Sequence, residues 1–241
     1  MDTAPRFLDA GEAALGVEFG AIVDPAINAK VLALDAALRA AAIAGVIETV
    51  PTYRALMVHY EPLELPRDDL VARIRVLLAH SGAAPSPRAR WRLPVSYDPV
   101  DAEDLFALAA AAGLTPERVR ALHAGAEYRA YMYGFAPGWL YLGGLPRELA
   151  VPRRATPRAP TPEGAILVGG GLALIAANSM PTGWYVVART PERLFSLERA
   201  PSFFIEPGDA ICFEGVDRAT FAALEARVKA GDIVAQRERL A

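Results

Sequence analysis

Cysteine and histidine are scarce in this chain, and both shortages limit its chemistry. Its 241 residues include one cysteine, Cys212, and three histidines. A single thiol excludes a disulfide within the chain and any metal site that needs several cysteine ligands. His59, His80 and His123 lie far apart and show no HExxH-type spacing. We therefore expect no metal site and a reduced, cytoplasmic location.

An excess of positive charge is also absent. The chain has 25 basic and 28 acidic residues, a formal net charge of −3. Proteins that bind nucleic acids by bulk electrostatics are usually strongly basic, so nucleic acid is not the expected partner. No P-loop or GxGxxG motif is present, so a nucleotide would have to be bound by other means.

A membrane-spanning segment is not expected either. The N-terminus has no basic region followed by an apolar run, as a signal peptide would. Residues 164–188 carry no charge, but they contain three consecutive glycines and Pro181. A lipid-exposed helix seldom has so many helix breakers, so buried strands joined by a turn are the better interpretation.

The first 88 residues have the pattern of a small α/β unit. Apolar residues alternate over 15–19, as in a half-buried strand, and Asp24-Pro25 is a typical helix start. Strands are expected over 46–50 and 53–60, and a second helix is expected to bury Leu70 and Ile74. This order predicts an open α+β sandwich over residues 1–88.

Residues 81–94 have the composition of a linker. Glycine and proline interrupt regular structure there, and the arginines at 88, 90 and 92 are expected to be solvated. A second domain over 89–241 is expected to begin with helices over 101–112 and 115–125. From residue 128, short apolar runs alternate with Gly/Pro turns, which predicts a closed or nearly closed β structure. A last helix is expected over 217–231.

The densest unusual segment spans residues 131–146, with five aromatic residues, four glycines and two prolines. Glycine lets the backbone approach a ligand closely, and aromatic rings provide flat apolar walls. The candidate binding residues in this segment are Tyr131, Phe135, Pro137, Gly138 and Tyr141. The alternative is a folded corner packed by its own aromatic rings.

A second candidate is the proline-stiffened loop that follows. Its arginines are Arg153, Arg154 and Arg158. Guanidinium groups bind carboxylates or phosphates in bidentate fashion, and a stiff loop lowers the cost of ordering them. The alternative is a solvated surface loop.

Polar residues around a tryptophan provide a third candidate. The polar residues that flank Trp184 and would line a polar pocket are Asn178, Ser179, Thr182 and Arg189, although a hydrogen-bonded turn fits the same residues. No catalytic acid, base or nucleophile can be assigned from them.

Two candidates come from the first domain. Arg54 has the strand parity of Leu56 and Val58, so on the core face its charge would need a partner or a site. His59 has the opposite parity. It is a candidate binding residue, although a satisfied or exposed histidine is the more common case.

Several strings of residues resemble a known family. They are Tyr128–Leu145 with Gly-Phe-Ala-Pro-Gly at 134–138, Pro-Arg-Arg-Ala-Thr-Pro-Arg at 152–158, and Gly183-Trp184 with Arg189-Thr190-Pro191. They are similar to the family of the 5-oxoprolinase B-subunit, also called KipI-like or allophanate hydrolase subunit 1-like, with carboxyltransferase subdomains C and D. The match extends to residues 11–20, 51–54 and 207–209.

The resemblance implies that the second domain, 89–241, is a cyclophilin-like β-barrel. It implies a partner of the 5-oxoprolinase C-subunit or KipA-like family, and a small amide or carboxylate substrate. The pair would open 5-oxoproline to glutamate with ATP, with or without magnesium, held by this chain or by the partner. In that reaction the arginines at 153, 154 and 158 would hold anionic groups.

Alternative functions stay open. One is a regulatory protein of the histidine-kinase-inhibitor type, and another is part of a urea- or allophanate-type carboxyltransferase or amidohydrolase. Prolyl isomerase activity would rest on fold analogy alone.

The sequence departs from the family pattern in two places. Pro94-Val-Ser-Tyr97 and residues 98–103 replace Pro-Val-Cys-Tyr and a Gly-Gly-Glu-Phe-Gly-like run, and residues 171–178 replace Gly-Gln-Thr-Gly-Ile-Tyr-Pro. These changes at expected pocket positions predict an altered substrate or lost activity.

Overall fold

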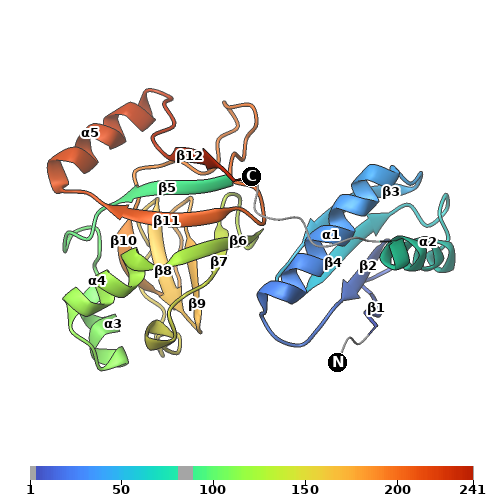
Figure 1. Cartoon of the computed structure of the whole chain (residues 1–241), viewed down its shortest axis with the longest axis horizontal. Coiled ribbons are helices and arrows are strands. Elements are labelled where there is room, and N and C mark those ends of the chain that lie inside the picture. The colour runs from blue at the N-terminus through green and yellow to red at the C-terminus, as the bar shows by residue number, and fades with distance from the viewer. Residues whose placement is uncertain (1–3, 81–88, 241) are drawn as a thin grey trace. The chain divides into compact units, whose positions relative to one another are not determined.

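A computed structural model describes residues 4–80 and 89–240 of the chain. The chain divides into two compact units, Met1–Ser86 and Pro87–Ala241, which we call unit 1 and unit 2 (Figure 1). The domain bound expected at residue 88 lies among residues 81–88, outside the described part, and stays a prediction.

Unit 1 is a sheet with helices packed on it. Its described elements are β1 (Arg6–Asp9), β2 (Ala14–Glu18), α1 (Pro25–Ala41), β3 (Val46–Pro51), β4 (Ala55–Tyr60) and α2 (Arg67–His80). The strand order is β1-β2-β4-β3, with antiparallel neighbours. As expected, α1 begins after Asp24, whose carboxylate accepts hydrogen bonds from the amides of Ala26 and Ile27 at 2.8 and 3.2 Å.

The core of unit 1 follows the alternation along β2 and β4. Leu15, Val17, Leu56 and Val58 are fully buried against α1 and α2. The expected strand over 53–60 was placed two residues too early, because β4 begins at Ala55. Strand parity therefore does not apply to Arg54. The short strand β1 was missed because its four residues carry little alternation.

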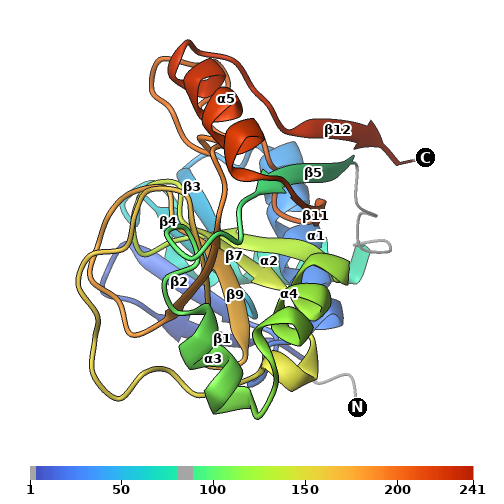
Figure 2. The same ribbon diagram turned by 90° about the vertical axis from the view of Figure 1, so that its left-hand side faces the viewer.

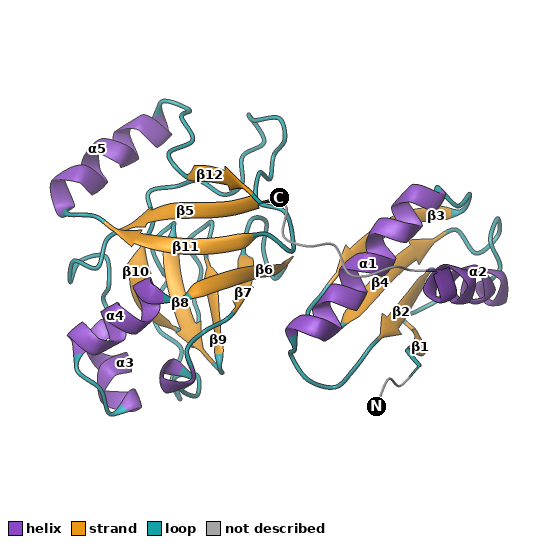
Figure 3. Ribbon diagram, viewed as in Figure 1, coloured by secondary structure: helices purple, strands orange, loops and turns teal. Residues whose placement is uncertain are grey.

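Unit 2 is built on a curled, mainly antiparallel sheet (Figure 3). Its described strands are β5 (Ala89–Val95), β6 (Glu127–Tyr133), β7 (Leu140–Gly143), β8 (Ala165–Gly169), β9 (Leu172–Ile175), β10 (Tyr185–Arg189), β11 (Ala210–Gly215) and β12 (Gln236–Arg239). Their order is β10-β8-β9-β7-β6-β11-β5-β12, and only β11–β5 among these pairs is parallel.

One edge strand of this sheet, β10, approaches the end of β5, which is next to the opposite edge. Ser96, just after β5, forms an isolated antiparallel bridge with Arg189 at the end of β10. Its amide donates to the Arg189 carbonyl at 2.8 Å, and the Arg189 amide donates back at 3.1 Å. The sheet therefore curls around the main core, and β8 is buried on both faces. This explains why residues 164–188 carry no charge.

The helices of unit 2 lie on two sides of its strands (Figures 1 and 2). The α3 (Leu105–Ala112) and α4 (Pro116–Gly125) helices pack on one side, and α5 (Arg218–Lys229) lies on the other. A short 3₁₀ turn, η1, spans Arg147–Leu149. The α3 helix starts four residues later than expected, because residues 98–104 form turns. No helix in the described ranges has the length and apolarity needed to cross a membrane.

The expected linker over 81–94 was wrong from Ala89 onward, where the chain forms β5. Ala89, Trp91 and Leu93 are buried and alternate with Arg90 and Arg92, which is a strand pattern. Arg90 is not simply solvated: it binds Glu127 at 2.8 Å and Glu238 at 3.2 Å. The exposed strand β12 was also missed, since its four polar residues show no apolar period.

Candidate functional site

A second apolar cluster lies on the face of β7–β10 opposite the main core. It includes Trp139 and Trp184, which are almost fully buried, and the partly buried Tyr141. Alternation along β7 explains it, because Leu140 and Leu142 enter the main core while Tyr141 points the other way. The rings of Tyr141 and Trp184 meet edge to face, 6.1 Å between centroids. We call this group the aromatic face.

The loop of residues 152–158, which we call the arginine loop, runs beside the segment leading to Trp184. The Arg154 amide donates to the Gly183 carbonyl at 2.7 Å, and the Arg158 amide donates to the Thr182 carbonyl at 2.9 Å. These bonds fix the loop backbone at both arginines. The arginine loop is therefore ordered by the chain itself.

Two of its arginines are held by one carboxylate. Arg154 Nη1 donates to Asp104 Oδ1 at 2.9 Å, and Arg158 Nη1 donates to Asp104 Oδ2 at 2.6 Å. Arg158 also forms an ion pair with Glu103, and its side chain is only 11% exposed. Asp104 additionally accepts the Val186 amide at 2.9 Å. Its carboxylate thus joins α3, the loop and β10.

The position of Asp104 shows that this network takes precedence over helix capping. Asp104 is the N-cap residue of α3, yet its side chain makes no capping hydrogen bond. A cap of this type contributes about 1 kcal/mol. The carboxylate points to the arginine loop instead.

Arg153 differs from its two neighbours. Its guanidinium lies over the ring of Trp184, 5.2 Å from the centroid, and the side chain is exposed. Within the described residues it forms no hydrogen bond or ion pair. Burial raises the pKa of Tyr141, and the charge of Arg153 partly offsets this, so the phenol stays protonated at neutral pH.

The glycine turn between β8 and β9 leaves space for this arrangement. A Cβ on Gly169 would lie 3.3 Å from the Trp184 ring, which is tighter than ordinary contact. A Cβ on Gly170 would lie 3.6 Å from Arg153 Nε. Gly170 and Gly171 also have positive φ angles, 61° and 78°, so the tight turn itself favours glycine.

The loop of residues 134–138 extends the aromatic face. Trp139 Nε1 donates a hydrogen bond to Asn178 Oδ1, and the Phe135 ring lies 5.0 Å from that of Trp139. Phe135 is 69% exposed at a φ of 70°, which is rare for a bulky residue. A Cβ on Gly138 would lie within 2.6 Å of Phe195 and Ala177, so glycine is required where these segments meet.

Other candidates lie outside this group. Tyr131 is buried, and its ring packs where Gly143 has no side chain. Arg189 belongs to another network, with Asp101 at 3.4 Å and Glu225 at 2.6 Å. It lines a cleft of about 390 Å³ beside α5.

The remaining candidates are polar residues of both units. Pro137 and Ser179 are exposed. In unit 1, Arg54 lies just before β4 and reaches Glu18 at 3.8 Å and the Gly20 carbonyl at 3.3 Å. His59 is half-buried on β4, opposite Ala14 and Glu48. Across the described residues no group of three or more His, Cys, Asp or Glu side chains is placed to hold a metal ion.

Sequence reasoning missed the acids that organise unit 2. Asp104 and Glu103 hold the arginine loop, and Asp101, 2% exposed, binds Arg189 and Arg218. The sequence did contain a signal for these contacts. Acidic residues precede an alanine-rich helix, and a loop elsewhere in the chain carries arginines of the opposite charge.

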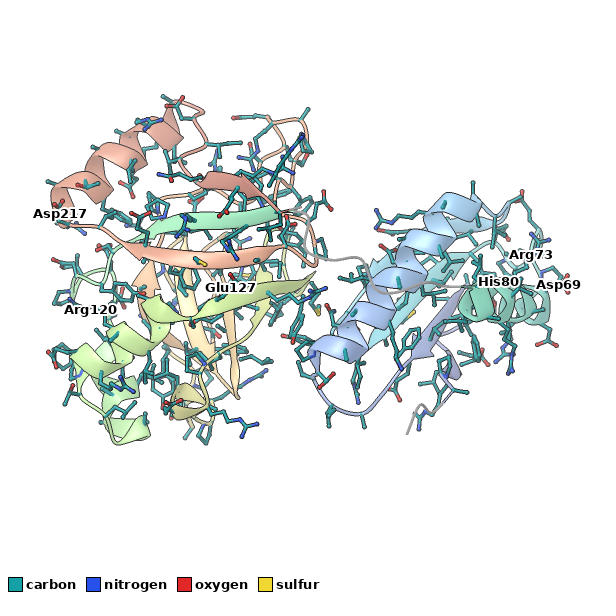
Figure 4. The ribbon with its side chains drawn as sticks, viewed as in Figure 1. Asp69, Arg73, His80, Arg120, Glu127 and Asp217 are labelled. Carbon is teal, nitrogen blue, oxygen red and sulfur yellow. The ribbon has the colours of Figure 1, made fainter. Side chains whose placement is uncertain are left out.

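A cleft of about 540 Å³ lies at the same end of the unit, where Figure 4 labels Arg120 and Asp217, and Arg218 also lines it.

Comparison with known proteins identifies relatives along most of the chain. The family model described as "Carboxyltransferase domain, subdomain C and D" matches residues 5–205. The B-subunit of 5-oxoprolinase from Bacillus subtilis (strain 168) is 29% identical over 224 residues, which cover 88% of this chain and 93% of that protein.

Solved structures agree with this match. The structure of TTHA0988 is 31% identical with a TM-score of 0.75, and covers 85% of this chain. This chain in turn spans 40% of the TTHA0988 chain. The urea carboxylase of Kluyveromyces lactis, 14% identical, aligns with a TM-score of 0.79 over 98% of this chain and 24% of its own, a likeness of fold.

Proposed function

The chain belongs to the family of the carboxyltransferase domain, subdomain C and D, and from this membership we propose that it is one subunit of an ATP-dependent complex of the 5-oxoprolinase type. The observation that carries the proposal is its similarity to 93% of the length of a protein named as the B-subunit of 5-oxoprolinase. The reaction proposed is the opening of 5-oxoproline, a small cyclic amide, to glutamate.

The candidate site supports a role in substrate binding. The partly exposed Tyr141 and the exposed Phe135 provide aromatic surface, and Arg153 provides a cation that no acid of the described residues neutralises. The protonated phenol of Tyr141 acts there as a hydrogen-bonding group rather than as a base. This chain would therefore bind and orient the substrate, and we assign activation of the amide to the partner.

ATP does not fit the candidate site of this chain. A nucleotide triphosphate needs several cations or a cradle of backbone amides around its phosphates. Arg154 and Arg158, the other cations of the loop, are already bound by Asp104. We therefore propose that the partner, of the 5-oxoprolinase C-subunit or KipA-like family, holds ATP.

We also propose that unit 2 is a cyclophilin-like barrel. The support is the curled sheet, whose first strand β10 is bridged to the segment after β5 through Ser96 and Arg189. In such a barrel the aromatic face lies on the outside of the wall, and Phe135 is its largely exposed ring.

The test is ATP hydrolysis by this chain co-expressed with candidate partners, with and without 5-oxoproline. We expect ATP hydrolysis to rise with 5-oxoproline and glutamate to form in equal amount. The control is the partner without this chain, which should show no such stimulation. A stable complex that neither hydrolyses ATP in response to 5-oxoproline nor forms glutamate would contradict the proposal.

A regulatory role is the second candidate, and one observation favours it. Phe135 is a largely exposed aromatic ring held at a strained backbone angle, as is typical of residues that contact another protein. Tight binding to a histidine kinase, without any ATP hydrolysis that depends on a small amide, would support this function over the enzymatic one.

A further inference from the structure

The three arginines of the arginine loop are not equivalent as ligand-binding groups. Arg154 and Arg158 each donate to Asp104, and the Nε of Arg154 is buried. Binding an external anion through either would require breaking a charge-assisted hydrogen bond in a partly buried setting. Arg153 needs no such exchange, because no partner in the described chain occupies its donors.

The contact with Trp184 leaves Arg153 able to bind a planar anion. A cation–π contact does not occupy the five N–H donors of a guanidinium, which lie in its own plane. A carboxylate binds in that plane through two parallel hydrogen bonds. Arg153 lies over Trp184, and no partner among the described residues occupies its donors, so the guanidinium is available to a carboxylate.

The surroundings of Arg153 are pre-organised. Asp104 holds the two arginines that follow it in the loop, at 154 and 158, and Pro152 precedes it directly. Gly169 leaves room for the Trp184 ring, over which the arginine lies. Because little ordering remains to be done on binding, more of the interaction energy appears as affinity.

The single positive charge of Arg153 favours a ligand with a single negative charge. One unneutralised guanidinium matches one carboxylate, whereas a phosphate carries more charge than it can balance. The nearby acids, Asp104 and Glu103, are occupied by other arginines and do not compete for Arg153. Tyr141, beside Trp184, is neutral and adds no repulsion.

We propose that Arg153, which lies over Trp184, binds the carboxylate of the substrate, and that Asp104 is a positioning residue that holds the loop in the binding geometry. The identity of the substrate, 5-oxoproline, rests on the proposed function, but the carboxylate site itself does not. Recognition of the carboxylate would separate 5-oxoproline from neutral lactams of the same ring size.

The test compares 5-oxoproline with its neutral carboxamide, 5-oxoprolinamide. Binding to the full chain is followed by calorimetry and by tryptophan emission, with Trp184→Phe to identify the responding indole. The KM for 5-oxoproline is measured in the co-expressed complex. We expect the carboxylate to bind about 10- to 100-fold more tightly than the carboxamide, as removal of a charged hydrogen-bonding pair implies.

Substitution of Arg153 should remove that preference. Arg153→Gln should weaken binding of 5-oxoproline, or raise its KM, by about 10- to 100-fold and leave the carboxamide unaffected. Arg153→Lys should give an intermediate affinity for 5-oxoproline, because lysine keeps the positive charge but cannot donate two parallel hydrogen bonds to a carboxylate. Arg118→Gln, an exposed arginine on α4, is the matched control. An unchanged preference in Arg153→Gln, or no carboxylate dependence in either assay, overturns the proposal.

The positioning role of Asp104 can be tested separately from carboxylate binding by Arg153. Asp104→Asn should raise the KM or Kd for 5-oxoproline and change Trp184 emission, with kcat unchanged, and Asp104→Glu should partly restore both. A lowered melting temperature with unchanged Kd, KM and emission would reduce Asp104 to a structural role. Glu117→Gln, which changes an exposed acid on α4 away from the arginine loop, is the control.

Failure of this proposal is distinguishable from failure of the proposed function. If the complex hydrolyses ATP with 5-oxoproline but Arg153→Gln behaves as the wild type, the carboxylate site is wrong and the function stands. If the chain binds 5-oxoproline through Arg153 but no complex turns it over, the site stands and the enzymatic function is wrong.

Discussion

Two arginines of unit 2 lie over aromatic rings at the same distance and have different partners. Arg189 is 5.2 Å from the centroid of Phe221, and Arg153 is 5.2 Å from that of Trp184. Arg189 also donates to the carboxylates of Asp101 and Glu225 and to a backbone carbonyl, while Arg153 contacts no acid among the described residues. Stacking on a ring therefore does not by itself indicate a ligand site.

The two carboxylates next to α3 extend this comparison. Asp101 joins Arg189 and Arg218, and so ties the bridged end of the sheet to the start of α5. Asp104 joins Arg154 and Arg158, and so ties the arginine loop to β10. Each acid satisfies two arginines. The first cluster leaves no arginine unneutralised, whereas the loop of the second carries Arg153.

The largest expected effect comes from breaking the Asp101 cluster. Asp101→Asn leaves Arg189 and Arg218 with a neutral partner at a position only 2% exposed. Loss of one member of a buried ion pair costs about 3–5 kcal/mol, somewhat less here because Arg218 is half exposed. We expect a marked fall in the free energy of unfolding, measured by urea denaturation.

The matched control breaks a surface pair of the same type. Arg227 and Asp232 are 3.0 Å apart, and both are about half exposed. Asp232→Asn should change stability by less than about 1 kcal/mol. Equal effects of the two substitutions would mean that the Asp101 cluster is no more than a surface contact.

A buried histidine sets the pH at which these stabilities should be compared. Burial lowers the pKa of His123 from its ordinary value of 6.5 to about 3. Between these values the unfolded chain binds a proton that the folded chain does not, so stability is complete above pH 6.5 and falls as the pH is lowered. The slope is at most about 1.4 kcal/mol per pH unit, or roughly 2 kcal/mol by pH 5.

Removal of the His123 imidazole should reduce the fall in the free energy of unfolding at acid pH. His123 shares a 2.7 Å hydrogen bond with Tyr97 and stacks on Phe213, so His123→Leu is expected to lower stability at every pH. The informative quantity is therefore the difference between pH 7 and pH 5 within each variant. If the wild type and His123→Leu lose the same stability over that range, another group is responsible for the acid sensitivity.

The next largest effect on stability is expected from loss of the Asp104 carboxylate. Asp104 is 13% exposed, and its removal leaves Arg154 and Arg158 without their acceptor. We expect Asp104→Asn to lower the free energy of unfolding by about 1–3 kcal/mol, less than Asp101→Asn. A larger loss than for Asp101→Asn would reverse the ranking of the two clusters.

Much of the fold could be predicted because burial imposes a period on the sequence. Alternation identified β2 and most of β4, and the Asp-Pro start located α1. Prediction failed where that period is interrupted. In β5 the first buried residues alternate with arginines and a buried proline follows, a composition that resembles a linker, and β12 buries none of its residues.

The candidate site was predicted only in part, because sequence does not say which charges are already paired. The arginine loop and Trp184 were both candidates from the sequence, and the structure brings them together, since Arg158 bridges to Thr182 near Trp184. Their division of roles depends on Asp104, which is distant in sequence and looked like part of a helix start. Only the three-dimensional pairing separates Arg153 from Arg154 and Arg158.

The smallest expected change in stability is that of Arg153→Gln. The side chain is exposed and has no acid partner among the described residues, so only its contact with the Trp184 ring is lost. An exposed cation–π contact contributes about 0.5–1 kcal/mol, so the free energy of unfolding should fall by no more than that. Arg189→Gln should lower it by several times as much, because three acceptors lose their donor. An arginine that the fold does not need, on a loop that the fold holds rigid, is what a ligand-binding role requires. Equal losses in the two variants would mean that Arg153, like Arg189, is part of the scaffold.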